Sequence, residues 1–368
     1  MTTTTESLRI AMLAPISWPL PPSGYGPWEL VAHNLTEELV KLGHDVTLFA
    51  AAGTRTSATL VESCPHALSM WPENERNRTR AFDPDTGLLE GPPDSRVWEQ
   101  LHIAMCMERA AAGEFDVVHS HLHVHALGFG RLINCPLVTT LHGSAWVRAV
   151  HPMLKKFSDL PYVSLSDAER SLLPELNYVA TVHNGIRLEE FPVERQKEDY
   201  LLFAGRLAPE KGPAEAIEVA RRSGRRLLMA GMIEPQHQEY FDQRIKPHLD
   251  GKNVEYLGLL SQKELAPVYR KAAGVLFLIS WCEPFGLVAV EAQASGTPLI
   301  ATRFGALPEI IIEGKTGFVV DTLDEAVMAT EKLAAIRPQD CRRNTEERFS
   351  AKTMAQGYER VYRQLVNR

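Results

Sequence analysis

The sequence predicts an α/β protein made of two successive halves, each with a parallel sheet. Short apolar runs typical of buried strands alternate with amphipathic segments of helical spacing along most of the chain. This alternation stops at the polar stretch 187–199 and restarts with the apolar run Tyr200–Ala204. The 368 residues are enough for two domains of ordinary size. We therefore expect two α/β domains that join near this polar stretch.

The first half begins with a strand, a helix and a returning strand. Leu8–Leu13 is expected to form the first strand, Glu29–Leu42 the helix and Asp45–Ala50 the second strand. Gly43 ends the helix, and so short a return favours a right-handed βαβ unit in a parallel sheet. The later expected elements are a helix over Val97–Ala112 and strands over Val117–His119, Leu137–Leu141, Tyr162–Leu165 and Tyr178–Val182.

A long polar stretch, roughly residues 53–96, separates the second strand from the next helix. It is interrupted by prolines and has little hydrophobic periodicity. A connection of this length inside a compact domain is usually functional or lacks fixed structure. The sequence does not decide whether it is ordered.

The second half repeats the strand pattern of the first. Its first expected strand is Tyr200–Ala204. At the end of the chain, Thr353–Val366 carries apolar residues near helical spacing, so a helix is expected there. Its apolar stripe fits either half of the protein. The further expected strands are Arg226–Gly231, Val254–Gly258, Gly274–Ile279 and Pro298–Thr302.

Composition limits the function classes. The 39 Lys and Arg residues minus the 46 Asp and Glu residues give a formal charge of −7, which weighs against nucleic acid as the main partner. Five cysteines without a CxxC pair are expected in a reducing compartment. The N-terminus shows no signal-peptide pattern, and no apolar run has the length of a bilayer span. We expect a cytoplasmic protein with no strong membrane signal, and its oligomeric state stays open.

Two glutamates follow the expected strand Gly274–Ile279. Glu283 precedes a Pro-Phe-Gly turn at the strand's carboxyl end, and Glu291 lies about two helical turns further along. Both carboxylates can then line one crevice and suit a ligand with two separate hydroxyl-bearing parts, such as a nucleotide sugar. The alternative is that Glu283 caps the helix and Glu291 forms a surface ion pair.

A basic pair follows the expected strand Tyr200–Ala204. In the segment Gly205–Gly212, Arg206 and Lys211 lie five residues apart between a strand and a helix. A guanidinium fork and an ammonium can converge on one anion there, as a leaving diphosphate requires. In isolation such a pair is usually solvated surface charge.

Two glycines, Gly24 and Gly26, precede the first helix. They do not form the GxGxxG pattern, which speaks against a dinucleotide-dependent dehydrogenase. They still let backbone amides and the positive end of the helix approach an anion. The alternative is a flexible loop.

Histidines gather after two strands of the first half. The run His119–His125 has four at period two, which could bind zinc on one continuous strand. We expect the strand to end near His119, which would scatter the rings, so no metal is predicted. His142 ends another buried strand, and its ring should project into the crevice. The alternative for His142 is a satisfied core histidine.

These segments resemble the retaining glycosyltransferases of the GT-B fold, specifically the large family four. The resemblance spans nearly the whole chain and includes the Asn-Gly-Ile signature that ends at Ile186, the stretch Ala294–Thr302 and the stretch Gly305–Ile311. It implies two Rossmann-like domains that face each other across a central cleft. The implied parts are an acceptor-binding domain over 1–186, a linker over 187–199, a nucleotide-sugar-binding domain over 200–349 and a C-terminal helix over 350–368 that returns to the first domain.

The resemblance also implies roles for single residues. A pair like Arg206 and Lys211 stabilises the departing diphosphate, and a histidine like His142 contacts the transferred sugar or the reacting centre. Glu283 would bind sugar hydroxyls and Glu291 the ribose diol. The implied catalytic residues are Arg206, Lys211, His142 and Glu283, and the implied donor-binding residues are Gly24, Gly26, Gly205, Glu283, Phe285, Gly286, Leu287, Glu291, Gly305 and Ala306.

We therefore expect a metal-independent retaining enzyme that moves a hexosyl group from a UDP- or GDP-sugar to an acceptor hydroxyl. No cofactor is expected beyond the donor substrate, and acceptor contacts are placed in the stretch 53–96. A sugar-nucleotide epimerase of the same fold and a non-catalytic sugar-nucleotide-binding protein remain alternatives. The sequence does not identify the base, the hexose or the acceptor.

Overall fold

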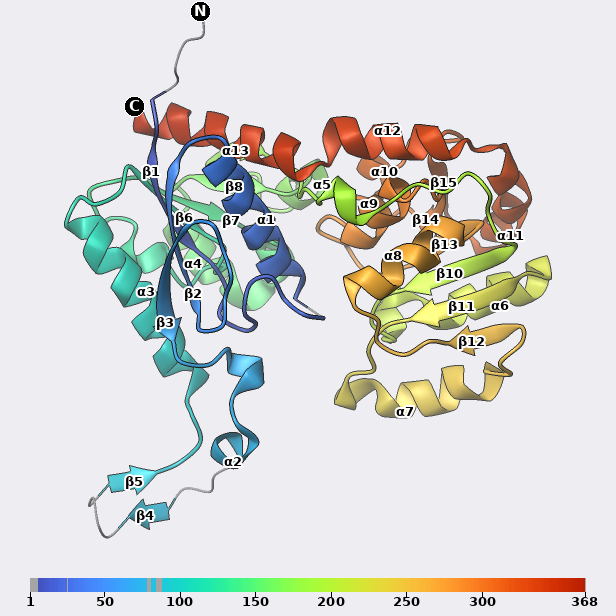
Figure 1. The fold of residues 1–368 in the computed structure, drawn as a ribbon, viewed down its shortest axis with the longest axis horizontal. Helices are drawn as coiled ribbons and strands as arrows, with labels where there is room; N and C mark the ends of the chain where they lie inside the picture. Colours follow the sequence, from blue (N-terminus) through green and yellow to red (C-terminus); the bar gives the residue numbers. More distant parts are fainter. Residues whose placement is uncertain (1–5, 25, 78–80, 84–87, 368) are drawn as a thin grey trace, which may run out of the picture. The chain divides into compact units, whose positions relative to one another are not determined.

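The computed structural model describes residues 6–24, 26–77, 81–83 and 88–367 and divides into two compact units. Unit 1 comprises Met1–Val163, Glu175–Ala180 and Gly357–Arg368, and unit 2 comprises Ser164–Pro174 and Thr181–Gln356. Each unit contains one main sheet of parallel strands with helices against it, which confirms the α/β class (Figure 1). The units interleave along the chain, and the domain boundaries expected from the sequence stay a prediction.

Unit 1 is built on a seven-stranded sheet of order β3-β2-β1-β6-β7-β8-β9. The paired strands from β3 to β8 run parallel. Six of the seven strands lie where the apolar runs predict them. The strands are β1 (Arg9–Leu13), β2 (Asp45–Ala51), β3 (Thr59–Cys64), β6 (Val117–Ser120), β7 (Leu137–Thr140), β8 (Tyr162–Ser164) and β9 (Tyr178–Thr181).

Strand β3 lies in the stretch 53–96, for which the sequence predicts no strand and leaves open whether it is ordered. Leu60 pairs with Leu48 of β2 in parallel register, at the edge of the sheet. An edge strand needs few apolar residues because it packs on one side only, so its sequence signal is weak. The stretch also contains α2 (Glu73–Arg76) and a hairpin of β4 (Ala81–Asp83) and β5 (Leu88–Glu90). Residues 78–80 and 84–87 of this stretch lie outside the described residues.

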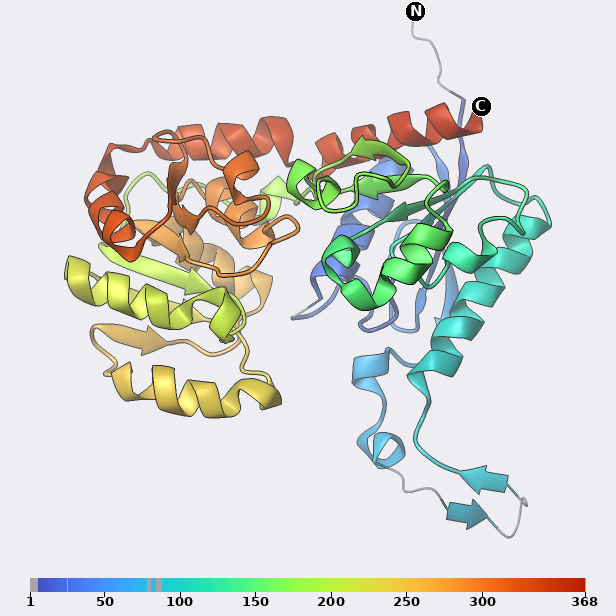
Figure 2. The same ribbon diagram turned by 180° about the vertical axis from the view of Figure 1, so that it is seen from behind.

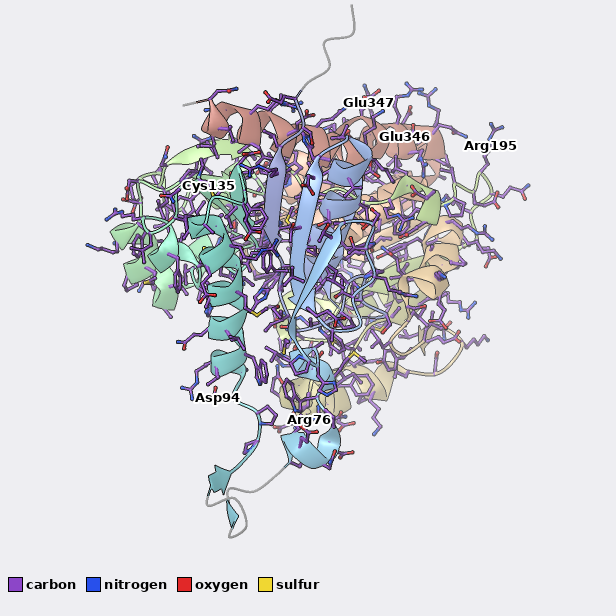
Figure 3. The ribbon with its side chains drawn as sticks, turned by 60° about the vertical axis from the view of Figure 1, so that its left-hand side comes forward. Arg76, Asp94, Cys135, Arg195, Glu346 and Glu347 are labelled. Atoms are coloured by element: carbon purple, nitrogen blue, oxygen red, sulfur yellow. The ribbon has the colours of Figure 1, made fainter. Side chains whose placement is uncertain are left out.

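The two long helices of unit 1, α1 and α3, each begin two residues before the start that the sequence predicts, whereas α4 is not predicted. Helix α1 has Pro27 at its first position, where the missing amide costs nothing. At the start of α3, the Asp94 side chain accepts a hydrogen bond from the Arg96 amide at 3.0 Å; Figure 3 labels Asp94 at this end of the helix. The helices are α1 (Pro27–Lys41), α3 (Ser95–Ala111) and α4 (His151–Lys156).

Unit 2 is built on a six-stranded parallel sheet of order β12-β11-β10-β13-β14-β15. Along β10, Leu201 and Phe203 pack into one core cluster and Leu202 into the other, so the sheet is buried on both faces. Of these strands, the sequence fails to predict only β15. The strands are β10 (Tyr200–Ala204), β11 (Arg226–Ala230), β12 (Val254–Tyr256), β13 (Gly274–Phe277), β14 (Leu299–Thr302) and β15 (Gly317–Val320).

Helices cover the sheet of unit 2. Helix α6 begins after Gly212 and α9 after Gly286, both at the carboxyl ends of strands. A single π-helical turn, Phe241–Ile245, follows α7. The helices are α5 (Asp167–Arg170), α6 (Pro213–Ser223), α7 (Gln238–Tyr240), α8 (Gln262–Lys271), α9 (Leu287–Ala294), α10 (Leu307–Ile310), α11 (Leu323–Lys332) and α12 (Pro338–Arg348).

The last helix, α13 (Ala351–Val366), starts in unit 2 and ends in unit 1 (Figure 1, Figure 2). The hydroxyl of Tyr362 lies 2.7 Å from Nδ1 of His119 on β6, and the hydroxyl of Tyr358 lies 2.8 Å from Oγ1 of Thr140 on β7. The predicted return of the terminal helix to the first half is therefore confirmed. Within the part of the chain that the structure describes, no helix has the length and apolar composition needed to cross a bilayer.

Candidate active site

The basic pair lies on the connection between β10 and α6 in unit 2. Gly205, the first residue after the strand, donates its amide to the carbonyl of Ala230 at 3.0 Å. A side chain on Gly231 would lie 1.6 Å from the Gly205 carbonyl oxygen, so the ends of β10 and β11 approach as closely as only glycine permits. Arg206 follows directly at this edge, as the sequence predicts.

Two carboxylates hold the Arg206 guanidinium. Nη1 donates to Oε2 of Glu234 at 2.5 Å, and Nη2 donates to Oε1 of Glu210 at 3.2 Å. Glu210 lies four residues further along the chain, whereas Glu234 follows β11. The sequence predicts the cation but gives no sign of the acid from the neighbouring strand.

Lys211 and Glu283 meet directly, although 72 residues separate them. The Lys211 ammonium donates to Oε2 of Glu283 at 2.7 Å, and both side chains are only 14% exposed. The ammonium also lies 4.3 Å from the centre of the Trp281 ring, within cation–π range. The structure thus brings together the expected phosphate-binding lysine and the expected sugar-binding glutamate, and adds an aromatic wall.

Gly212 explains why these residues meet. It has a positive φ of 74°, and a Cβ atom there would lie 2.0 Å from the carbonyl oxygen of Leu278. Glycine therefore allows the start of α6 to touch the chain just beyond β13. The Ser280 amide also donates to the Glu210 carbonyl at 3.0 Å, so the connection before α6 lies against the chain that leads from β13 to Glu283.

The backbone of Glu283 is fixed by the loop after β14. The Ala306 amide donates to the Glu283 carbonyl at 3.0 Å, and a Cβ atom on Gly305 would lie 2.1 Å from the same oxygen. The Ala306 amide thus has a partner within the protein, so Ala306 supports Glu283 instead of offering that amide to an anion. The ring of Phe285 is buried against Phe349, so this side chain belongs to the core and does not line the site.

Glu291 lies on α9, which begins at Leu287 after the left-handed Gly286 (φ 97°). It is about one helical turn from the helix start. Its carboxylate accepts hydrogen bonds from Tyr269 Oη at 3.1 Å and from Gln262 Nε2 at 3.3 Å. Burial raises the pKa of Glu291 to about 7, against the lowering effect of these two bonds.

His142 belongs to unit 1 and follows β7 with a φ of 49°. Its Nε2 lies 2.8 Å from Nδ1 of His121. Burial lowers the pKa of both rings well below 6.5, so both are neutral at physiological pH. Within the described residues, Nδ1 of His142 is buried and has no hydrogen-bond partner. Of the two glycines, Gly24 is exposed and Gly26 caps α1.

The histidine run is not a single ligand set. Strand β6 ends at Ser120, close to the predicted end, and the rings beyond it turn to different partners. His119 contacts Tyr362, whereas His123 contacts Ser144 and the exposed Trp28 ring. Across the described ranges, no group of three or more His, Cys, Asp or Glu side chains is placed to hold a metal ion.

Two α/β units with parallel sheets, one of which carries a basic pair and two acids at the carboxyl edge of its sheet, define a GT-B glycosyltransferase. Residues 187–352 match the family described as glycosyl transferases group 1, and residues 29–190 match glycosyltransferase family 4. The chain belongs to this family of glycosyltransferases, as the sequence motifs indicate.

Curated relatives match most of the chain. It is 28% identical to a glycogen synthase of Mycobacterium tuberculosis, over 96% of this chain and 94% of the relative. It is also 28% identical to a D-inositol 3-phosphate glycosyltransferase of Streptomyces avermitilis, over 87% and 78%.

Solved structures confirm the fold. Sucrose-phosphate synthase from Thermosynechococcus elongatus superposes with a TM-score of 0.75 at 18% identity, over 98% of this chain and 99% of that one. HepE of Anabaena, solved with UDP and glucose, superposes with a TM-score of 0.67 at 18% identity, over 97% and 100%.

Proposed function

We propose that the protein transfers a hexosyl group from a UDP- or GDP-sugar to an acceptor hydroxyl, with retention of the anomeric configuration. The observation that carries the proposal is the 2.7 Å contact between Lys211 and Glu283. An ammonium has three donors, so Lys211 keeps two for a ligand while it touches Glu283. A cation beside a carboxylate suits a ligand whose phosphate lies next to hydroxyl-bearing carbons, as in a sugar phosphate.

Each site residue then has a chemical role. Lys211 and Arg206 stabilise the diphosphate, whose charge grows as its bond to the sugar breaks. Glu283 accepts hydrogen bonds from sugar hydroxyls, and Glu291 accepts them from the ribose diol. For His142, a neutral imidazole, we keep the role that the family resemblance implies, which is contact with the transferred sugar.

No metal and no cofactor beyond the donor substrate enter the proposal, because the two cations can neutralise the leaving group. The UDP-sugar among the two proposed donors draws on HepE, which was solved with UDP and glucose. A cytoplasmic location is also proposed, since all five cysteines carry free thiols, as in a reducing compartment.

The first test is thermal unfolding with UDP, GDP, ADP and their glucose and mannose conjugates. A donor that binds should raise the unfolding temperature in a concentration-dependent way. Stabilisation by none of these ligands would contradict the donor site.

The second test is turnover of the binding donor with sugar and polyol acceptors after treatment with EDTA. NMR of the product should show the donor's anomeric configuration, and activity should survive the chelator. An inverted product, or activity that returns only with added Mg²⁺, would contradict retention or metal independence respectively. An epimer formed from donor alone would point to a sugar-nucleotide epimerase instead.

A further inference from the structure

The Arg206 guanidinium in unit 2 is already paired with a carboxylate of the protein itself. Its Nη1 donates to Oε2 of Glu234 at 2.5 Å, and the two side chains are 24% and 23% exposed. The loops that carry them are joined, because the Leu207 amide donates to the Met232 carbonyl at 2.9 Å. The acid is thus held in place by the fold, at the carboxyl end of the strand beside β10.

Glu234 differs from the second acid that contacts Arg206. Glu210 lies four residues away on the same connection and makes a longer contact of 3.2 Å. Glu234 comes from another strand end and occupies the Nη1 side of the fork. A phosphate that approaches Arg206 must share this side with Glu234 or displace it, because two anions on one side of a guanidinium repel each other.

We propose that Glu234 is an internal competitor for the phosphate-binding arginine and sets how tightly the site holds a nucleoside diphosphate. This inference rests on the proposed function of unit 2. The carboxylate keeps Arg206 paired when the site is empty and returns to it when the diphosphate leaves. It therefore weakens binding of the nucleoside diphosphate product and speeds its release.

The substitution Glu234→Gln tests the effect of the negative charge of Glu234 separately from the effect of its hydrogen bond to Arg206. A glutamine oxygen can still accept a hydrogen bond from Arg206, so the guanidinium keeps its place, but the competing negative charge is gone. UDP or GDP, whichever stabilises the wild-type protein, should then bind roughly three- to tenfold more tightly. Where product release limits turnover, kcat should fall by a similar factor.

The matched control is Glu255→Gln on β12, which removes the same charge from the same unit. Glu255 pairs with Arg226, so its removal should leave nucleotide binding unchanged. The nucleosides uridine and guanosine give a second control. They carry no phosphate, so Glu234→Gln should not change their binding.

Isothermal titration of the full chain with UDP, GDP and the two nucleosides tests the inference, with circular dichroism to show that each variant is folded. Tighter diphosphate binding in Glu234→Gln alone, without a change for the nucleoside, supports it. Unchanged or weaker diphosphate binding overturns it, as does an equal gain in Glu255→Gln. If the wild-type protein binds neither UDP nor GDP, the proposed function fails, and this inference fails with it.

Discussion

Glu291→Gln should change how the stability of the ligand-free protein depends on pH. Burial raises the pKa of Glu291 from 4.5 to about 7 in the folded protein. The folded state therefore binds this proton more tightly than the unfolded state does. The contribution of Glu291 to the free energy of unfolding is most favourable below pH 4.5, falls as the pH rises, and is lost above about pH 7.

The size of the effect follows from the two pKa values. The difference between about 7 and 4.5 is about 2.5 units, and each unit corresponds to about 1.4 kcal/mol. Because the residue keeps some contact with solvent, we expect about 1 to 3 kcal/mol. Glutamine does not titrate, so Glu291→Gln should lack this decline between pH 5 and pH 8.

Urea unfolding at pH 5, 6, 7 and 8 measures the difference directly. The wild-type protein should lose about 1 to 3 kcal/mol relative to Glu291→Gln across this range. Glu347→Gln on the exposed face of α12, labelled in Figure 3, is the control and should follow the wild-type curve. If the difference between wild type and Glu291→Gln does not change with pH, the carboxyl group is not held in a buried, neutral state.

Three further substitutions test other parts of the structure. Lys211→Ala should lower kcat by the equivalent of about 2 to 4 kcal/mol and weaken nucleotide binding much less, in steady-state kinetics with calorimetry; near-normal turnover would exclude the proposed role. Tyr362→Phe removes the hydrogen bond to His119 and should cost about 1 to 2 kcal/mol of unfolding free energy without changing nucleotide affinity. Gly212→Ala places a methyl group 2.0 Å from a backbone oxygen and should lower the free energy of unfolding by more than about 2 kcal/mol. Its control, Gly224→Ala, has a similar positive φ but open space around the new methyl group, and should lower the free energy of unfolding by about 1 kcal/mol in the same urea titration. Equal costs for the two glycines would show that the close approach at Gly212 is not important.

The sequence predicts the sheets well because most of their strands are buried on both faces. Runs such as Tyr200–Ala204 are continuously apolar and therefore stand out from the surrounding helices. Within the two main sheets, the strands that the sequence misses are Thr59–Cys64 and Gly317–Val320, and both lie at sheet edges. There the apolar signal is short, and pairing with a neighbour decides the structure.

The site residues likewise divide into those that the sequence predicts and those that it does not. The loops with Arg206, Lys211 and Glu283 could be placed because each follows a predictable strand, and parallel strands bring their carboxyl ends to one edge. Two partners could not be placed from the sequence. Glu234 reaches Arg206 only through the order of the strands, and Tyr269 reaches Glu291 only through the packing of α8.

The path of α13 determines how unit 1 could be produced alone. Its segments are scattered along the chain, and the last of them, Gly357–Arg368, carries Tyr358 and Tyr362 into the sheet. A truncated chain that stops at the end of the first half would leave the buried polar groups of His119 and Thr140 without these hydroxyls. Arg363 Nη1 donates to the Glu6 carbonyl at 3.0 Å, which brings the final helix to the start of β1. A circular permutation that fuses this helix ahead of residue 6 is therefore the natural route to an isolated N-terminal half.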